Sequence, residues 1–185
     1  GYKSIKEQTV ELLPINILIG GNGIGKSNFI SIFTLIRNLY EQNLQNYILT
    51  KGGADSLLYM GKKETSHISF DLFFAKRDQE AHNRFIINLK EAQDSLFIER
   101  IGTAFNSGKI WHEQLHEANK QESSFKKDHA GQAFYVNSLL REFEVYHFHD
   151  TGDRSPMKGK CNIDDNAVLK NNGSNIAAFL YYLKE

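Results

Sequence analysis

The chain has 185 residues, of which 41% are hydrophobic and 24% charged, a composition typical of a globular protein with one core. Lysine plus arginine and aspartate plus glutamate both number 22, so the formal net charge is zero and gives no support for a general attraction to nucleic acid or to an anionic membrane. No apolar run approaches the roughly 20 residues that span a bilayer, and the single cysteine, Cys161, excludes an internal disulfide. We therefore expect a soluble, cytoplasmic protein without membrane contact.

The first forty residues predict strand, glycine loop and helix, in that order. "TVELL" is typical of a short strand, Pro14 marks a turn, and the apolar run "INILI" at residues 15–19 predicts a buried strand. In residues 27–40 apolar side chains recur at spacings of three and four, which predicts a broadly buried helix. The loop between them reads "GGNGIGKS" and begins at Gly20.

This loop matches the pattern G-x-x-x-x-G-K-S, whose residue types suit the binding of phosphate. Glycines permit positive φ angles and a close approach of the backbone to a polyphosphate, which a Cβ would obstruct. The N–H groups of residues 23–27 are expected to point at the α- and β-phosphates, at the positive end of the following helix. Lys26 is expected to reach the β- and γ-phosphates, and the Ser27 hydroxyl to complete the shell of a Mg²⁺ ion. The loop glycines expected to serve the phosphate are Gly20, Gly23 and Gly25.

The rest of the chain predicts a β-meander, a polar helical stretch and a closing helix. The segments "SHISFDLFFAK", "RFIINLKEA" and "SLFIERIGTAF" alternate apolar and polar residues, which indicates antiparallel hairpins. Residues 109–143 are polar with scattered apolar positions, and we expect a helical insertion there. "FEVYHFHD" at residues 143–150 is a further strand candidate. The closing helix is expected to carry apolar side chains at Ile176, Phe179, Leu180 and Leu183.

A competing motif, "HEQLH", spells the H-E-x-x-H pattern of zinc peptidases. On a helix, His112 and His116 would share one face, with Glu113 as general base on a metal-bound water. The extended pattern fails because Asn119 and Glu122 occupy its next two fixed positions. We therefore favour a solvated helix that carries His and Glu pairs, and keep the zinc peptidase as an alternative.

Two weaker patterns are also present. "NKQE" at residues 119–122 approximates a guanine-reading N-K-x-D loop, but it follows the polar "LHEA" instead of a buried strand, so we do not expect guanine recognition. His147, His149 and Asp150 stand at the end of a strand candidate and would be placed to touch metal or substrate, although a polar strand face explains them equally well.

The opening "GYKSIKEQTVELLPINILIGGNGIGKSNFI" resembles the N-terminus of the RecF, OLD and SMC-like branch of ABC-type ATPases, where an aromatic-Lys-Ser strand precedes "GPNGSGKSN". The segments "GGADSLLYMG", "YHFHDTGDRSP" and "DDNAVLKNNGSNIAAFLYYLKE" are similar to landmarks of the AAA15 and AAA21 groups of bacterial ATPases. Gly21 and Ile24 replace the commoner proline and serine, at positions where the backbone holds the phosphate. The resemblance and the motif imply nucleotide contacts from Lys3, Ser4, Asn22, Gly23, Ile24, Gly25, Lys26, Ser27 and Asn28, with Lys26 and Ser27 as the catalytic pair and Ser27 on Mg²⁺.

Other landmarks of this family are missing from the sequence. There is no buried Walker B strand, no "LSxG" signature and no switch histidine, and Asp71 and Asp150 are poor substitutes for the Walker B carboxylate. "YHFHDTG" stands where the glutamine loop is expected, yet it contains no glutamine. The resemblance therefore implies an α/β P-loop fold in which residues 1–185 are the N-terminal lobe of an ABC-type ATPase head, with the C-terminal half outside this stretch.

The resemblance also implies a function. Heads of this branch dimerise around ATP and Mg²⁺ and couple hydrolysis to action on DNA or to control of a partner nuclease, and many relatives serve bacterial antiphage defence, including Septu-like and retron-linked systems. We expect the same here, with turnover only in the intact protein or dimer. The alternative is a nucleotide-gated assembly or scaffold subunit with little or no turnover.

Overall fold

The computed structural model describes residues 1–75, 82–108, 110–146, 148, 152 and 155–184. The chain divides into two compact units, Gly1–Phe143 and Glu144–Glu185.

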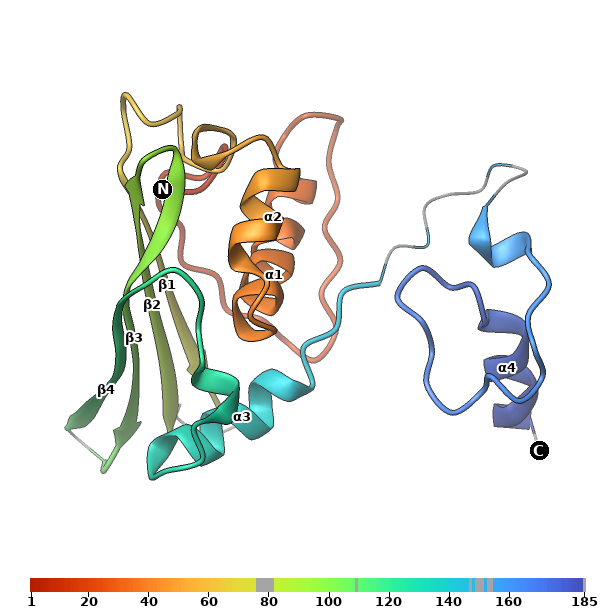
Figure 1. The fold of residues 1–185 in the computed structure, drawn as a ribbon. Coiled ribbons are helices and arrows are strands. Elements are labelled where there is room, and N and C mark those ends of the chain that lie inside the picture. The colour runs from red at the N-terminus through yellow and green to blue at the C-terminus, as the bar shows by residue number, and fades with distance from the viewer. Residues whose placement is uncertain (76–81, 109, 147, 149–151, 153–154, 185) are drawn as a thin grey trace. The chain divides into compact units, whose positions relative to one another are not determined.

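The first unit is built on a four-stranded antiparallel sheet in the order β1-β2-β3-β4 (Figure 1). Its strands are β1 (His67–Phe74), β2 (Asn83–Ala92), β3 (Ser95–Asn106) and β4 (Trp111–Lys120). The first three coincide with the hairpins that the alternating pattern predicts, so that part of the expectation is confirmed. Register shifts within the β2–β3 and β3–β4 pairs place buried side chains on the covered face despite the irregular alternation.

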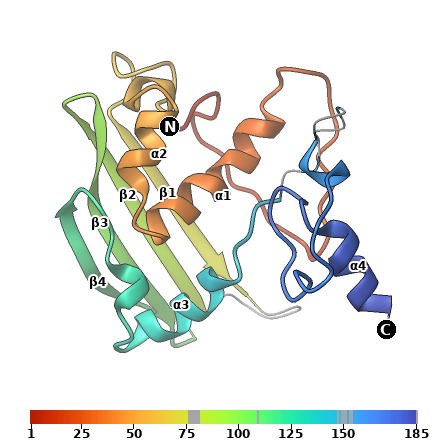
Figure 2. The same cartoon turned by 45° about the vertical axis from the view of Figure 1, so that its right-hand side comes forward.

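Three helices cover one face of this sheet (Figures 1 and 2). They are α1 (Lys26–Tyr40), α2 (Leu44–Thr50) and α3 (Gln132–Arg141), and α1 confirms the helix expected after the glycine loop. Only the second half of α1 is fully buried, since its buried side chains begin at Leu35. The core combines helix and strand residues, among them Leu35, Leu39, Tyr40, Leu44, Phe85, Ile87, Leu89, Phe125 and Val136.

The strands expected before the glycine loop are not formed. Residues 9–19 have no strand assignment, and Ile15, Ile17 and Ile19 are 82%, 79% and 87% exposed. A strand satisfies its backbone by pairing with a neighbour, and the sheet of this unit offers no neighbour to this segment. The prediction of a buried strand at residues 15–19 is therefore wrong for this structure.

The helical insertion expected at residues 109–143 is only partly correct. Gln132–Arg141 is helical, as α3, but Trp111–Lys120 forms the fourth strand of the sheet. The pairing of this segment with β3, from Ile98–Lys120 to Asn106–Trp111, satisfies its backbone and overrides its weak helical pattern.

In its described residues, the second unit contains one 3-10 turn and one helix. The turn is η3 (Pro156–Lys158) and the helix is α4 (Ile176–Lys184), which begins where the sequence predicts it. The buried Asn175 holds the preceding loop, because it accepts a hydrogen bond from the Lys170 N–H at 2.8 Å and donates to the Asp165 and Val168 carbonyls. Of the expected strand at 143–150, residues 143–146 and 148 form none, and His147, His149 and Asp150 lie outside the described residues. No helix in the described part of the chain is long and apolar enough to cross a membrane.

Candidate functional site: the glycine loop and the start of α1

The glycine loop enters α1 through two residues with left-handed backbone. Gly23 has φ 84° and Gly25, the residue before the helix, has φ 100°. A Cβ on Gly25 would also lie 3.1 Å from the Ser4 hydroxyl oxygen. Gly21 has no such φ and nothing within 4 Å of a built Cβ. Gly20 also has a positive φ, 156°, and a Cβ there would overlap the Ile24 side chain. Glycine is thus favoured at three positions of the loop and dispensable at Gly21.

The first turn of α1 presents unsatisfied donors. The first helical hydrogen bond runs from the Phe29 N–H to the Gly25 carbonyl at 2.9 Å, so the preceding N–H groups have no acceptor within the helix. No acidic residue stands in the first turn, and no side chain of the capping residue satisfies these donors. The start of the helix therefore keeps the partial positive charge of its macrodipole.

Lys26 lies over the loop. Its ammonium donates to the carbonyls of Gly20 and Gly21, each at 2.7 Å, so the positive charge is held directly above the loop backbone. A lysine ammonium, free amides and a helix N-terminus together make an environment for an anion with several oxygens.

The N-terminal turn of the chain is hydrogen-bonded to the start of α1. Tyr2 and Ile5 exchange two backbone hydrogen bonds of 2.8 Å, so Lys3 and Ser4 lie in a turn and not in the strand that the resemblance implies. The Asn28 amide donates to the Ser4 hydroxyl at 2.8 Å. The structure thereby brings Ser4, Gly25 and Asn28 together.

Lys3 points one turn further along α1. Its ammonium donates to the Ser31 hydroxyl at 3.0 Å, which also contacts the buried Tyr2 hydroxyl at 2.9 Å. Burial, and then the positive charge of Lys51, lower the pKa of Lys3. Lys3 therefore anchors the N-terminal turn to the helix.

Three predicted residues have no fixed partner here. Ile24 is 63% exposed, and the exposed side chains of Asn22 and Ser27 make no hydrogen bond to any described residue. Among those residues there is also no cluster of three or more histidine, cysteine, aspartate or glutamate side chains suited to a metal.

Asp71, one of the two aspartates weighed as a Walker B carboxylate, is already paired with an arginine. Asp71 accepts two hydrogen bonds from Arg84, at 2.6 and 2.5 Å, in a fork-to-fork pair across β1 and β2. The hydrogen bond to Asp71 is the main reason why the pKa of Arg84 is raised. Arg84 and Arg100 also bind Glu113, at 3.0 and 2.6 Å. Asp71 and Glu113 are thus members of an ion-pair network on the sheet, while Asp150 lies outside the described residues.

The H-E-x-x-H motif does not form a metal site. It lies on β4, where a rise of about 3.3 Å per residue separates His112 from His116 by about 13 Å, too far to share one ion. Glu113 is held by the two arginines. The solvated helix that we favoured for this segment is wrong, and so is the zinc site.

His116 is instead part of the core. Its side chain is 2% exposed, and its ring nitrogens contact the Thr103 hydroxyl and the Asp128 carboxylate, each at 2.7 Å. It also meets the Phe125 ring edge to face, with 5.1 Å between ring centres. The role of His116 is to join β3, β4 and the turn before α3.

The last residue of the "NKQE" segment, Glu122, caps the start of a helix. Glu122 accepts hydrogen bonds from the N–H groups of Leu44 and Gln45 at 2.9 and 2.7 Å, so it caps the start of α2. No local signal in the sequence reveals this contact, because it joins positions 77 and 78 residues apart.

No protein-family model, no curated protein and no solved structure matches this chain.

Proposed function

We propose that the loop at residues 20–27 binds ATP with Mg²⁺. The observation that carries the proposal is the loop's conformation: two left-handed glycines lead into the free N–H groups of α1 while Lys26 lies across the loop. A triphosphate supplies the several oxygens that such donors need.

Four of the predicted residues then have a defined task. Lys26 exchanges the two loop carbonyls for β- and γ-phosphate oxygens, which carry full negative charge and are the stronger acceptors. The exposed Ser27 hydroxyl is free to ligate Mg²⁺. Ser4 and Asn28 fix the rim of the loop beside Gly25 through their mutual hydrogen bond.

We further propose that this lobe belongs to an ABC-type ATPase head with an α/β P-loop fold. The support comes from residues 10–19, where most aliphatic side chains are exposed to solvent. Strands buried on both sides have this composition, as in the parallel sheets of P-loop proteins. Further strands supplied by the C-terminal half of such a head would pair with this segment and cover it.

The biological role follows from the sequence resemblance alone. In this proposal the cytoplasmic head dimerises around ATP and couples hydrolysis to action on DNA or to control of a partner nuclease, in bacterial antiphage defence. The alternative is a nucleotide-gated scaffold with little turnover. Asp71, the described carboxylate closest to a Walker B pattern, is engaged by Arg84 in a bidentate pair and is not free to polarise water.

The test is the affinity for Mg-ATP of the wild-type chain and of Lys26→Ala, measured by calorimetry. Removal of this charge is expected to weaken binding by about ten- to hundredfold, or about 1.5 to 3 kcal/mol. Lys90→Ala is the matched control, because Lys90 is an exposed lysine on β2 and its loss should leave the affinity unchanged. Equal affinities of wild type and Lys26→Ala would refute the proposal.

A further inference from the structure

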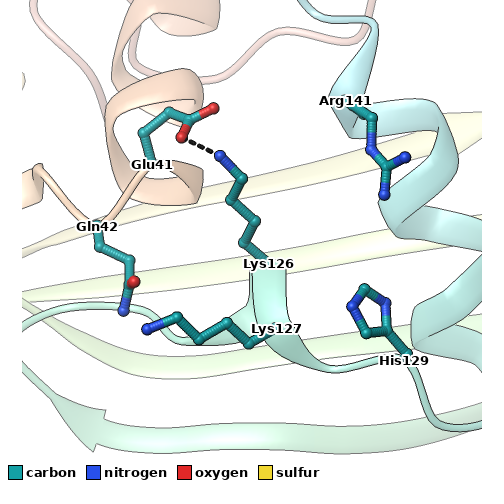
Figure 3. A pocket seen from close by; sticks show the side chains of 6 residues that line it. All are labelled: Glu41, Gln42, Lys126, Lys127, His129 and Arg141. Atoms are coloured by element: carbon teal, nitrogen blue, oxygen red, sulfur yellow. Dashed lines mark hydrogen bonds and ion pairs between the residues drawn. The ribbon is translucent and has the colours of Figure 1, made fainter.

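A second group of cations lies around an open pocket of about 500 Å³ in the first unit (Figure 3). Three segments contribute to it: the end of α1, the 3-10 turn η2 (Phe125–Lys127) with the residues after it, and the last turn of α3. The lining residues are Glu41, Gln42, Lys126, Lys127, His129 and Arg141.

The positive charge of this pocket is only partly balanced. Glu41 is the one acid in the lining, and it pairs with both Arg37, at 2.9 Å, and Lys126. The exposed side chains of Lys127 and Arg141 have no acidic partner in the part of the chain that the structure describes. Because the whole chain has no net charge, this excess is a local feature.

The backbone that carries these groups is fixed in advance. The buried amide of Asn137 donates to the Phe125 carbonyl at 3.0 Å and to the Asp128 carbonyl at 2.5 Å. The fully buried Phe125 ring anchors the same turn in the core. Binding at this pocket would therefore cost little ordering of the main chain.

The free polar groups of the pocket include several hydrogen-bond donors. Figure 3 shows the Arg141 side chain directed toward His129, and Lys127 extended toward Gln42. A guanidinium fork, an ammonium and a carboxamide match an anion with several oxygens and more than one charge. Stabilisation of the α3 C-terminus by a cation would account for Arg141, but not for Lys127, which stands on no long helix.

We propose that this pocket binds a phosphate group, carried either by a nucleic-acid strand or by a small phosphorylated molecule. The pocket lies at the far end of α1 from the glycine loop, and 15 helical residues span about 22 Å. It is therefore a second site, and it stands or falls independently of ATP binding at residues 20–27.

The test compares two triple variants of the whole chain, both of which carry Lys26→Ala so that the glycine loop contributes less. Lys127→Gln with Arg141→Gln removes the two unpaired charges of the pocket. Lys63→Gln with Lys90→Gln removes two charges from other exposed positions and is the control. One probe is a fluorescein-labelled oligothymidylate of about 20 nucleotides, read by anisotropy at about 50 and about 200 mM salt. The other is sodium tripolyphosphate, read by calorimetry.

The pocket variant should lose at least about tenfold in affinity for one of the probes, against less than about twofold for the control. With the oligonucleotide, the slope of log affinity against log salt should fall by about 1.4, since each lost phosphate contact contributes about 0.7 on single strands. Loss confined to the oligonucleotide identifies a nucleic-acid phosphate, and loss confined to tripolyphosphate identifies a small ligand. Binding of neither probe, or equal losses in the two triple variants, overturns the proposal; matching circular dichroism spectra exclude misfolding as the cause.

Discussion

Replacement of His116 by alanine tests the structural account of the H-E-x-x-H segment. The variant loses a hydrogen bond to Thr103, one to the Asp128 carboxylate and the edge contact with Phe125. These are worth about 1, about 1.5 to 3 and about 0.5 to 1 kcal/mol when taken singly. Because contacts in one network are not additive, we expect a total loss of about 3 kcal/mol in the free energy of unfolding.

The assay is urea and thermal unfolding followed by circular dichroism. A loss of this size should lower the melting temperature by about 6 to 12 °C in a unit of this length. His112→Ala is the matched control, since His112 is an exposed residue of the same strand and its loss should cost about 0.5 kcal/mol. His116→Leu separates packing from hydrogen bonding, because it fills the volume but leaves Thr103 and Asp128 without their partner. Equal melting temperatures for the two alanine variants would refute the reasoning, and full recovery by leucine would refute its hydrogen-bond part.

Three further predictions concern the glycine loop, the loss of stability at acidic pH and the turnover of ATP. Gly25→Ala should destabilise the loop by about 1 to 2 kcal/mol and weaken ATP binding in calorimetry, because φ is 100°, whereas Gly21→Ala should change neither. Burial raises the pKa of Glu117, but hydrogen bonds from Ser124 and Ser123 outweigh it and hold the pKa below 4.5. The charged form thus stabilises the fold above pH 4.5, and urea midpoints should fall between about pH 5 and about pH 3 less steeply in Glu117→Gln than in wild type. Phosphate release by the 185-residue chain should stay near background and be unaffected by Asp71→Asn; vigorous turnover lost in that variant would contradict this.

Local signals in the sequence were sufficient where an element depends on its own residues. The helix after the glycine loop, the three hairpin strands and the start of α4 follow from periodicity and turn residues. The pattern of "HEQLH" was ambiguous, since positions four apart share a face on a helix and on a strand alike. Pairing with β3 decided for a strand, and that partner is distant in sequence. The same reasoning explains residues 15–19, whose strand pattern has no neighbour in this sheet.

The glycine loop and the basic pocket likewise differ in how far apart their residues lie in the sequence. The glycine loop is contiguous, so its left-handed residues and its lysine were predicted by position. The basic pocket joins Gln42, Lys127 and Arg141 from three separate segments, and only the fold brings them together. Asp128 likewise meets His116 through the turn before α3, a contact that no spacing rule predicts.

The cap that Glu122 places on α2 has a consequence for the order in which the chain opens. Seven residues are too few for a helix to persist alone in water, so α2 depends on this carboxylate and on its packing. Glu122 follows the end of β4, so the cap forms only when the chain between Gln45 and Glu122, more than 70 residues long, has closed into a loop. Local fraying of α2 alone therefore leaves a carboxylate without its donors, while release of β4 removes the cap. In hydrogen exchange, the amides of Leu44 and Gln45 should become unprotected together with the β3–β4 pair, as one cooperative unit.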